Sequence, residues 1–462
     1  MEFLSTLNKT VSALVWGPPM LALMLGTGLY LSARTGFLQF RKFGPVMKNT
    51  LGKIFTRQKA GTGSVTPFQA VSTALAGTAG TGNIAGITLA LCLGGPGSLF
   101  WLWVTALIGM ATKYAEVTLA IRFRERNAAG DWVGGTMYTI KNGLGRRWAW
   151  LGGVFCVFCA LAAFGMGNAV QVGNISAAVQ NAAAVFLPGA GKYAEEIGWA
   201  VGLIVAVFAA VVLLGGVKRL GRVTETLIPL MSLVYIICCL AVLLTHTQGL
   251  GHAVQLIFRG AFDPKAAFGG VSGFTVSSAL SWGLRRGVFT NEAGLGSAPM
   301  AHAASSETNP VKQGYYGIFE VFIDTIVLCT LTGLSLLASG VPLPYGQSAG
   351  TEVNAAAFAT VFGEKAANLL LAVSITVFAA ATVLSWGLYG ARCAEYLLGS
   401  RAIRPYQLLF SGMCVLGAVM KLDLAWALSD TFNGLMALPN LVAVLCLSGL
   451  VAKLTRRELE HL

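Results

Sequence analysis

The sequence is short of charged residues. Only 11% of its 462 residues are Asp, Glu, Lys or Arg, whereas 55% are hydrophobic, and the mean hydropathy is +0.69. A soluble domain usually carries charge at about a quarter of its positions. A chain with less than half of that content cannot form a water-facing surface of normal size, which excludes an ordinary soluble protein.

The sequence also lacks the usual signatures of enzymes. It has only four histidines, and it contains no H-E-x-x-H, Walker or G-x-S-x-G motif. Nine cysteines are present, almost all within apolar segments, and we interpret Cys156 and Cys159 as buried neighbours on one helix face. We therefore expect neither an enzyme nor a redox or metal centre built on cysteine.

Long apolar runs are what the sequence has in abundance. Runs of about 20 residues recur along the whole chain, and each is long enough to cross a bilayer core of roughly 30 Å. These runs predict an all-α polytopic membrane protein. We place eleven spans at approximately 13–32, 67–91, 99–121, 149–178, 198–216, 225–245, 264–284, 315–338, 367–390, 405–421 and 432–452.

The net charge of +13 reflects an excess of Lys and Arg over Asp and Glu. With the N-terminus outside and the C-terminus inside, most of the 32 basic residues fall on the inner side, Arg285 and Arg286 among them. Such a bias in short loops sets membrane topology. We therefore expect a protein of the cytoplasmic (inner) membrane that binds no nucleic acid, and nothing in the sequence indicates an obligate protein partner.

The order of the spans indicates a repeat. GTAGTGNIAG (77–86) interrupts span two, which begins inside, and GGVSG (269–273) lies in span seven, which begins outside. Two five-helix units of opposite orientation, each opening with an interrupted helix, are typical of secondary transporters. The chain divides accordingly into a leading transmembrane helix, a basic interfacial segment, two inverted repeats and a cytoplasmic tail, at 1–33, 34–66, 67–246, 247–452 and 453–462.

The interruptions have a chemical use. Where a helix unwinds, its freed carbonyls suit a hard cation such as sodium, and the N–H groups that open the next half-helix suit a carboxylate. Asn83 is a natural first residue for the outer half-helix. A single glycine is also explained by close helix packing, but a glycine run paired with a second cluster favours a binding site.

Two further spans carry polar residues that suit such a site. In span nine, Ala379, Thr382 and Trp386 share one helix face, although the threonine hydroxyl could bond to its own helix and the indole could lie at the membrane interface. In span four, Gln171 lies on one face with Asn168 and Asn174. Its amide could contact a substrate or bridge two helices.

Charged residues within the spans are functional candidates by default. Lys113 and Glu116 are three residues apart, so a local ion pair is the simplest interpretation. Glu320 and Asp324 share a face and have no evident basic partner, so they could relay protons or line a wet vestibule.

Three long segments resemble the signatures of one transporter family. GTAGTGNIAGITLAL (77–91), GGPGSLFWLWVTALIGMATKYAEV (94–117) and RRGVFTNEAGLGSAPMAHAA (285–304) are similar to those of the alanine/glycine:cation symporter family. The resemblance implies a LeuT-type 5+5 inverted-repeat fold of the amino acid–polyamine–cation superfamily, with one extra N-terminal helix. It also implies cotransport of sodium with small neutral amino acids, typically alanine and glycine, and D-alanine in some members.

The resemblance also implies roles for individual residues. Sodium would bind the carbonyls of Ala76 and Ala79 together with Ala379 and Thr382, and Ser385 could compensate for Val383, which replaces the family's usual hydroxyl. The residues implied to face the amino acid are Thr78, Gly80, Thr81, Gly82, Asn83, Gln171, Gly269, Gly270 and Trp386. The segment after Arg285 and Arg286 would belong to an inner gate, with Glu292 forming a breakable ion pair with them.

The sequence therefore predicts a sodium-coupled symporter that imports small neutral amino acids by alternating access. A proton-coupled symporter using Glu320 and Asp324, and a neutral amino acid exchanger, stay open as alternatives. A channel would instead have continuous pore-lining helices.

Overall fold

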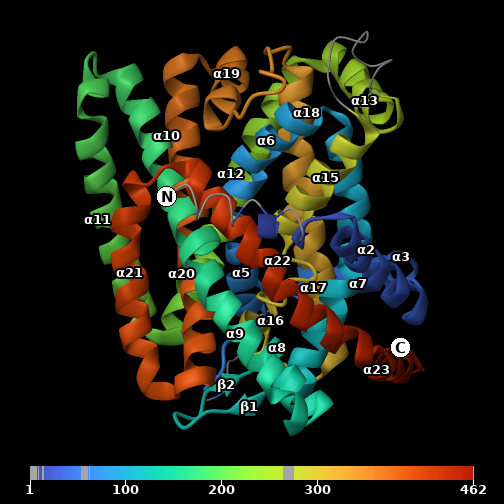
Figure 1. Ribbon diagram of the computed structural model, residues 1–462. Helices are drawn as coiled ribbons and strands as arrows, with labels where there is room; N and C mark the ends of the chain where they lie inside the picture. Colours follow the sequence, from blue (N-terminus) through green and yellow to red (C-terminus); the bar gives the residue numbers. More distant parts are fainter. Residues whose placement is uncertain are drawn as a thin grey trace.

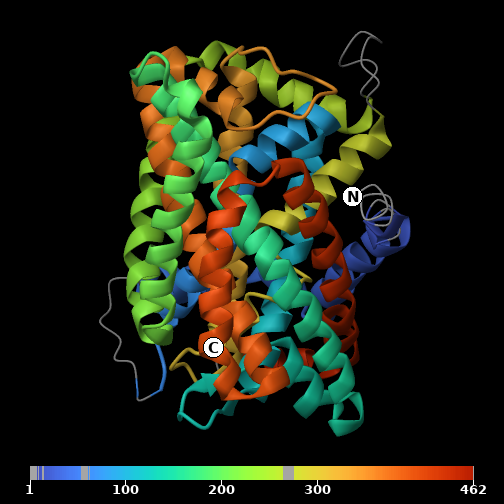
Figure 2. The same cartoon turned by 60° about the vertical axis from the view of Figure 1, so that its left-hand side comes forward.

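The computed structural model describes residues 8, 10–12, 15–53, 61, 63–263 and 275–460. Nearly all of these residues are helical, and two short strands, β1 (Glu125–Arg126) and β2 (Trp132–Val133), form an antiparallel hairpin. The hairpin lies at one end of the molecule, and α13 (Thr247–Phe262) and α19 (Thr351–Phe362) lie at the other (Figures 1 and 2). We call these the hairpin end and the α19 end. The predicted all-helical architecture is confirmed.

Most long helices run between the two ends (Figure 2). They are α7 (Gly97–Phe123), α9 (Ala149–Phe164) with the π-helical η5 (Gly165–Ala169) and α10 (Val170–Phe186), α11 (Ala194–Leu213), α12 (Gly216–Thr245), α17 (Pro310–Val321) with the π-helical η7 (Phe322–Cys329) and α18 (Thr330–Ala338), α20 (Glu364–Leu398), α21 (Ile403–Val419) and α22 (Leu422–Cys446). Among the described residues, seven helical stretches are long and apolar enough to cross a bilayer, or eight if α22 and the next helix form one bent span. The number of eleven spans stays a prediction.

Shorter elements precede, connect or follow the long helices. They are α2 (Pro18–Arg34), α3 (Leu38–Arg41), α4 (Phe43–Thr50), η1 (Leu51–Lys53), α8 (Thr136–Thr139), η3 (Ile140–Leu144), η4 (Arg146–Trp148), η6 (Ala190–Tyr193), η8 (Ser400–Ala402) and α23 (Ser448–Glu460). Two helices that the fold interrupts complete the set: α5 (Pro67–Thr78), η2 (Thr81–Asn83) and α6 (Ala85–Gly94) form one, and α15 (Val276–Asn291) and α16 (Pro299–His302) form the other.

The last predicted span, 432–452, differs from the structure. The chain bends by 57° between α22 and α23, and α23 continues as helix to Glu460. Val451, Ala452 and Thr455 are buried on one side of α23, whereas Arg456 and Arg457 are exposed on the other. Because the apolar run continues across the bend, composition alone did not reveal it.

Span seven also differs from its prediction. Residues 264–274, which include Gly269, Gly270 and the GGVSG run, lie outside the described residues. The helix α15 continues past Arg285 and Arg286, so these arginines lie within a helix rather than in a loop. Arg286 is buried, and its Nη2 lies 3.2 Å from Oδ2 of Asp430 on α22. An ion pair with Asp430, which is 17% exposed, rather than the membrane surface, therefore accounts for the position of this charge.

A main-chain contact joins the two interrupted helices at the hairpin end. Val65 precedes α5; its N–H donates to the Ala304 carbonyl at 2.9 Å, and its carbonyl accepts from the Ser306 N–H at 2.7 Å. Arg124, at the end of α7, donates to three carbonyls of the same segment, those of Ala303, Ser305 and Glu307. This end is therefore held by backbone bonds and one arginine.

Replacing Arg124 should weaken this end of the fold. Arg124→Gln removes a guanidinium whose three hydrogen bonds lie at 3.0, 2.6 and 2.7 Å from their acceptors. Because bonds to a charged group contribute about 1.5–3 kcal/mol each and carbonyls would lose their donors, the purified variant should unfold at a clearly lower temperature. Arg147→Gln, at an exposed position, is the control. Equal melting temperatures for both variants would contradict this role.

Candidate functional site

The first interruption lies where the glycine run predicted it. α5 ends at Thr78, and the backbone leaves helical geometry at Ala79 (φ −77°, ψ 69°) and Gly80 (φ −112°, ψ −150°) before α6 begins at Ala85. Residues 77–86 are all buried. The predicted break in this helix is confirmed, and its freed backbone groups must find partners inside the protein.

Side chains of α20 and α10 supply those partners. Thr382 Oγ1 lies 2.8 Å from the Ala76 carbonyl oxygen, and Ser385 Oγ donates to the Thr73 carbonyl at 2.7 Å. On the other side of the break, Gln171 Oε1 accepts from the N–H of Thr81 at 3.2 Å and from its hydroxyl at 3.0 Å. The structure thus brings Gln171 and Thr382, which the sequence singled out, to the break.

Gly80 lies between these two side chains. A Cβ atom built on Gly80 would lie 2.6 Å from Thr382 Oγ1 and 3.0 Å from Gln171 Oε1. A Cβ at Gly82 would lie 3.1 Å from Thr290 Cγ2 and 3.3 Å from Phe289 Cδ1 of α15. Only a residue without a side chain lets the two helix breaks and their partners approach this closely.

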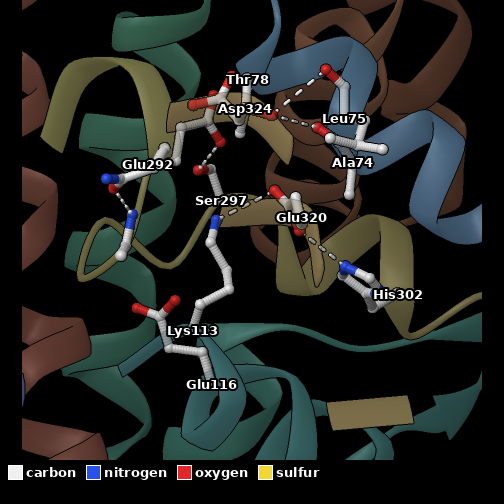
Figure 3. Close-up of polar contacts among 12 residues, drawn as sticks. Ala74, Leu75, Thr78, Lys113, Glu116, Glu292, Ser297, His302, Glu320 and Asp324 are labelled. Atoms are coloured by element: carbon white, nitrogen blue, oxygen red, sulfur yellow. Dashed lines mark hydrogen bonds and ion pairs between the residues drawn. The ribbon is translucent and has the colours of Figure 1, made fainter. Parts of the chain in front are cut away.

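The other predicted sodium and substrate residues lie beside this contact. Ala79 and Ala379 are buried, and Ala379 is one turn before Thr382 on α20. The hydroxyl of Thr78 bonds back to its own helix, 3.3 Å from the Leu75 carbonyl (Figure 3).

We expected Asn83 to begin the outer half-helix, but it does not. Ile84 is the residue that precedes α6, and the Asn83 amide instead donates to Asp324 on η7, at 2.9 Å to the carbonyl and 2.8 Å to Oδ1. Because η7 is π-helical, its backbone hydrogen bonding differs from that of an α-helix. The carbonyl of Asp324 accepts a hydrogen bond from the Asn83 side chain. Asn83 thereby joins the first break to η7.

A second break lies between α15 and α16. After Asn291, Glu292 (φ 54°), Gly294 (φ 95°) and Gly296 (φ 79°) adopt left-handed geometry, and helix resumes at Pro299. We predicted that this segment belongs to an inner gate and that a helix break lies at 269–273, which is outside the described residues. The motif NEAGLGSAP carried the signal, because two glycines followed by a proline suit a turn that ends in a new helix.

Polar side chains from α7, α8 and α22 hold the second break. Glu116 Oε1 accepts from the Gly294 N–H at 3.0 Å and from the Asn440 side-chain amide, which also donates to the Gly294 carbonyl at 2.9 Å. Thr136 lies between the Gly296 carbonyl, at 3.1 Å, and Asn440 Oδ1, at 2.8 Å. These contacts occupy the backbone groups that the two glycines expose.

The predicted ion pairs at this level are wrong. Lys113 pairs with Glu320 on α17, with Nζ 3.3 Å from Oε1, rather than with Glu116 (Figure 3). Glu320 therefore has a basic partner, and its Oε2 also lies 3.0 Å from His302 Nε2. Glu292 accepts from Ser297 Oγ at 2.5 Å and from Trp386 Nε1 at 2.9 Å rather than pairing with the arginines of α15.

Trp386 connects α20 to the second break. It is fully buried, so it does not lie at a membrane interface. Its indole N–H donates to Glu292, and its Cβ side packs against Gly167 of η5, where an added Cβ would lie 2.1 Å away. Trp386 thus contacts the second break, as Gln171 and Thr382 contact the first, and all three side chains are buried.

Comparisons with known proteins point to one family. Residues 1–460 match the model of the Sodium:alanine symporter family. The Sodium/alanine symporter AgcS of Methanococcus maripaludis is 41% identical over 463 residues, which cover 99% of this chain and 97% of that protein. An uncharacterized transporter of Haemophilus influenzae is 39% identical, with 99% and 97% covered, and the Probable sodium/glutamine symporter GlnT of Bacillus subtilis is 35% identical, with 95% and 87% covered.

The fold has a solved counterpart. The crystal structure of MhsT in complex with L-phenylalanine superposes with a TM-score of 0.60 at 14% identity, covering 86% of this chain and 99% of that one. At this identity the match shows a shared fold. The match of residues 1–460 to the family model and the relatives at 35% to 41% identity show that the chain belongs to the Sodium:alanine symporter family, whose members are secondary transporters and not enzymes.

Proposed function

We propose that this protein is a sodium-coupled symporter that imports alanine, glycine and similar small neutral amino acids across the cytoplasmic membrane. The observation that carries the proposal is the contact across the first break, where Thr382 Oγ1 lies 2.8 Å from the Ala76 carbonyl. The family and the names of its relatives support the same function. The N-terminus would lie outside and the C-terminus inside.

The architecture that we propose is a 5+5 inverted repeat with a leading helix. The first unit, within 67–246, consists of α5–α6, α7, α9–α10, α11 and α12, and the second, within 247–452, of α15–α16, α17–α18, α20, α21 and α22. The leading span is α2, and the spans then number eleven. The support is that each unit opens with an interrupted helix, as inverted-repeat transporters do.

The proposed sodium site combines Ala76 and Ala79 with Ala379 and Thr382. A carbonyl and a hydroxyl oxygen already meet there, and hard cations prefer oxygen ligands of this kind. Ser385, one turn further along α20, contacts the Thr73 carbonyl and is the hydroxyl next in reach.

The proposed amino acid site faces the same loop. Thr78, Gly80, Thr81, Gly82 and Asn83 supply it from the first break. Gln171 and Trp386 border it. Gly269 and Gly270, which lie outside the described residues, are also predicted to face the amino acid. Gln171 already contacts both the N–H and the hydroxyl of Thr81, so its amide is placed to respond when the loop takes up a ligand. The fully buried indole favours substrates with small side chains.

Coupling follows because one loop serves both ligands. Sodium bound beside Ala76 and Thr382 would fix Gly80, whose Cα faces both Thr382 and Gln171. Ordering the loop for one ligand reduces the entropy that the second ligand must remove, which makes binding of the two cooperative.

Proton coupling is the second candidate function. Lys113, Glu320 and His302 form a buried chain of ionisable groups beside the second break, and such groups within membrane proteins often carry protons. In this alternative, Glu320 would carry the coupling ion instead of the oxygen atoms around Ala76.

Replacing external sodium by choline should abolish alanine uptake. We expect the initial rate of labelled alanine uptake into proteoliposomes to fall at least tenfold, because the site beside Ala76 suits a small hard cation. Vesicles without protein set the background. Uptake that persists in choline and follows a proton gradient would instead support the second candidate function.

Removing the Thr382 hydroxyl should weaken sodium binding selectively. For Thr382→Val, we expect the sodium concentration at half-maximal alanine uptake to rise roughly tenfold, which corresponds to about 1.4 kcal/mol. Thr360→Val, at an exposed position of α19, is the matched control and should behave as wild type. An unchanged sodium dependence in Thr382→Val would remove this residue from the site.

Adding one methyl group at the first break should block transport. Gly80→Ala places a Cβ 2.6 Å from Thr382 Oγ1, so the hydroxyl or the loop must move. We expect alanine uptake to fall below a tenth of the wild-type rate in protein that still elutes as a folded species. Gly412→Ala, where an added Cβ meets no atom within 4 Å, should transport normally. Similar rates in the two variants would show that the loop tolerates the change.

A further inference from the structure

Four buried carboxyl groups gather around the two breaks and their neighbouring helices. They belong to Glu116, Glu292, Glu320 and Asp324, and each is at most 3% exposed. Within the described part of the chain, the basic side chains in contact with this group are Lys113 and His302, both fully buried and both bound to Glu320. The positions of Lys113, Glu320 and His302 can be followed in Figure 3.

The hydrogen bonds of His302 indicate a neutral ring. Its Nδ1 accepts from the Gln313 amide at 2.9 Å, and the Gln313 carbonyl oxygen in turn accepts from Ser305 Oγ at 3.0 Å. The single ring proton is then on Nε2 and faces Glu320. Four carboxylates would therefore face one ammonium group, that of Lys113. An unpaired charge buried in a protein costs several kcal/mol, so binding a proton at one of these carboxyl groups lowers the free energy of the group.

The contacts of three carboxyl groups suit the ionised form. Glu292 receives one donor on each oxygen, from Ser297 and from Trp386. Asp324 likewise receives Asn83 on Oδ1 and Thr325 on Oδ2. Glu292 and Asp324 accept hydrogen bonds at both oxygens, as a carboxylate does. Glu320 has a hydrogen-bond contact with His302 at Oε2 and an ion-pair contact with Lys113 at Oε1.

Glu116 differs from these three. Both of its donors, the Gly294 N–H and the Asn440 amide, bind Oε1. Its Oε2 is buried and, among the residues that the structure describes, has neither a hydrogen-bond partner nor an ion-pair contact, whereas Glu320 Oε1 faces Lys113. A buried oxygen without a partner costs less free energy in a neutral carboxylic acid than in a charged carboxylate.

We propose that Glu116 is a proton-binding site, with the proton on Oε2. A proton suits this position better than a metal ion, because a metal ion needs several oxygen ligands whereas the groups that contact Glu116 are N–H donors. The site lies at the second break, apart from the proposed sodium ligands at the first. The inference goes beyond the proposed function and does not depend on which substrate the protein carries.

The surroundings determine what loss of this proton would do. The ionisable groups that act on Glu116 are Lys113 on the same helix and Glu320 of α17. The other buried members of the group are Glu292, His302 and Asp324, from the second break, α16 and η7. The helices α22 and α8 present Asn440 and Thr136, which do not titrate. A charged Glu116 would add a fourth carboxylate to this group while still holding the Gly294 N–H, so proton release would strain the break that Glu116 now fixes.

Infrared spectroscopy of the full-length protein in lipid vesicles tests the proposal directly. A protonated carboxylic acid in a water-free site has a C=O stretching band separate from that of a carboxylate. We expect wild-type protein near neutral pH to show this band, and Glu116→Gln to lack its contribution in the difference spectrum. Glu364→Gln, at an exposed position, should retain the wild-type band.

Two further measurements test the proposal if Glu116→Gln does not fold and if the site binds sodium instead of a proton. If Glu116→Gln does not fold, Glu116→Asp should keep the band but shift it, because an acid remains with altered contacts. Exchanging potassium for sodium in the buffer should leave the wild-type band in place. A wild-type spectrum without the band, a band that Glu116→Gln leaves intact, or a band that sodium abolishes would each overturn the proposal. None of these readouts requires alanine uptake, so a failure of the proposed function would be seen separately.

Discussion

The structure depends on one constraint: backbone groups released from a helix inside an apolar environment must be bonded again. Both interrupted helices meet it with side chains from other helices. At the first break, Thr382 and Gln171 contact the groups freed around Ala76 and Thr81. At the second, Glu116 and Asn440 hold both backbone groups of Gly294. The polar side chains of α7, α10, α20 and α22 are therefore explained by the breaks rather than by the helices that carry them. Their removal would leave the backbone without partners.

The parts that the sequence predicted have local signals. Glycines combined with threonine and asparagine inside an apolar span identified the first break, because those residues weaken a helix wherever it lies. The three-residue spacing on α20 identified Thr382, since helical periodicity places it on the face of Ala379. The amide at Gln171 was conspicuous for the same reason: a polar group in an apolar run needs a partner. In each case the residues that produce the signal lie within about one helical turn of one another.

The parts that were missed depend on contacts between distant segments. Lys113 and Glu116 have favourable spacing for an ion pair, yet Lys113 binds Glu320, since α17 packs against α7 and brings a carboxylate to it. The break in NEAGLGSAP was not predicted, because glycine content directed the prediction to GGVSG, which lies outside the described residues. The actual signal in NEAGLGSAP is the pair of left-handed glycines before Pro299. Asn83 was expected to cap a helix, but a carbonyl of η7 offered it a tertiary partner. Sequence periodicity carries no information on which of several helices will supply such a partner.

The short bridge between Val65 and the segment after α16 has a mechanical consequence. Two main-chain hydrogen bonds join the residue before α5 to the segment that follows α16. If α5 moves at the hairpin end, either α16 moves with it or both hydrogen bonds of Val65 break. Because the pair shares one residue, loosening one bond misaligns the other. Opening at this end is thus expected to be cooperative. The helices α5 and α16 should move together until both hydrogen bonds of Val65 break.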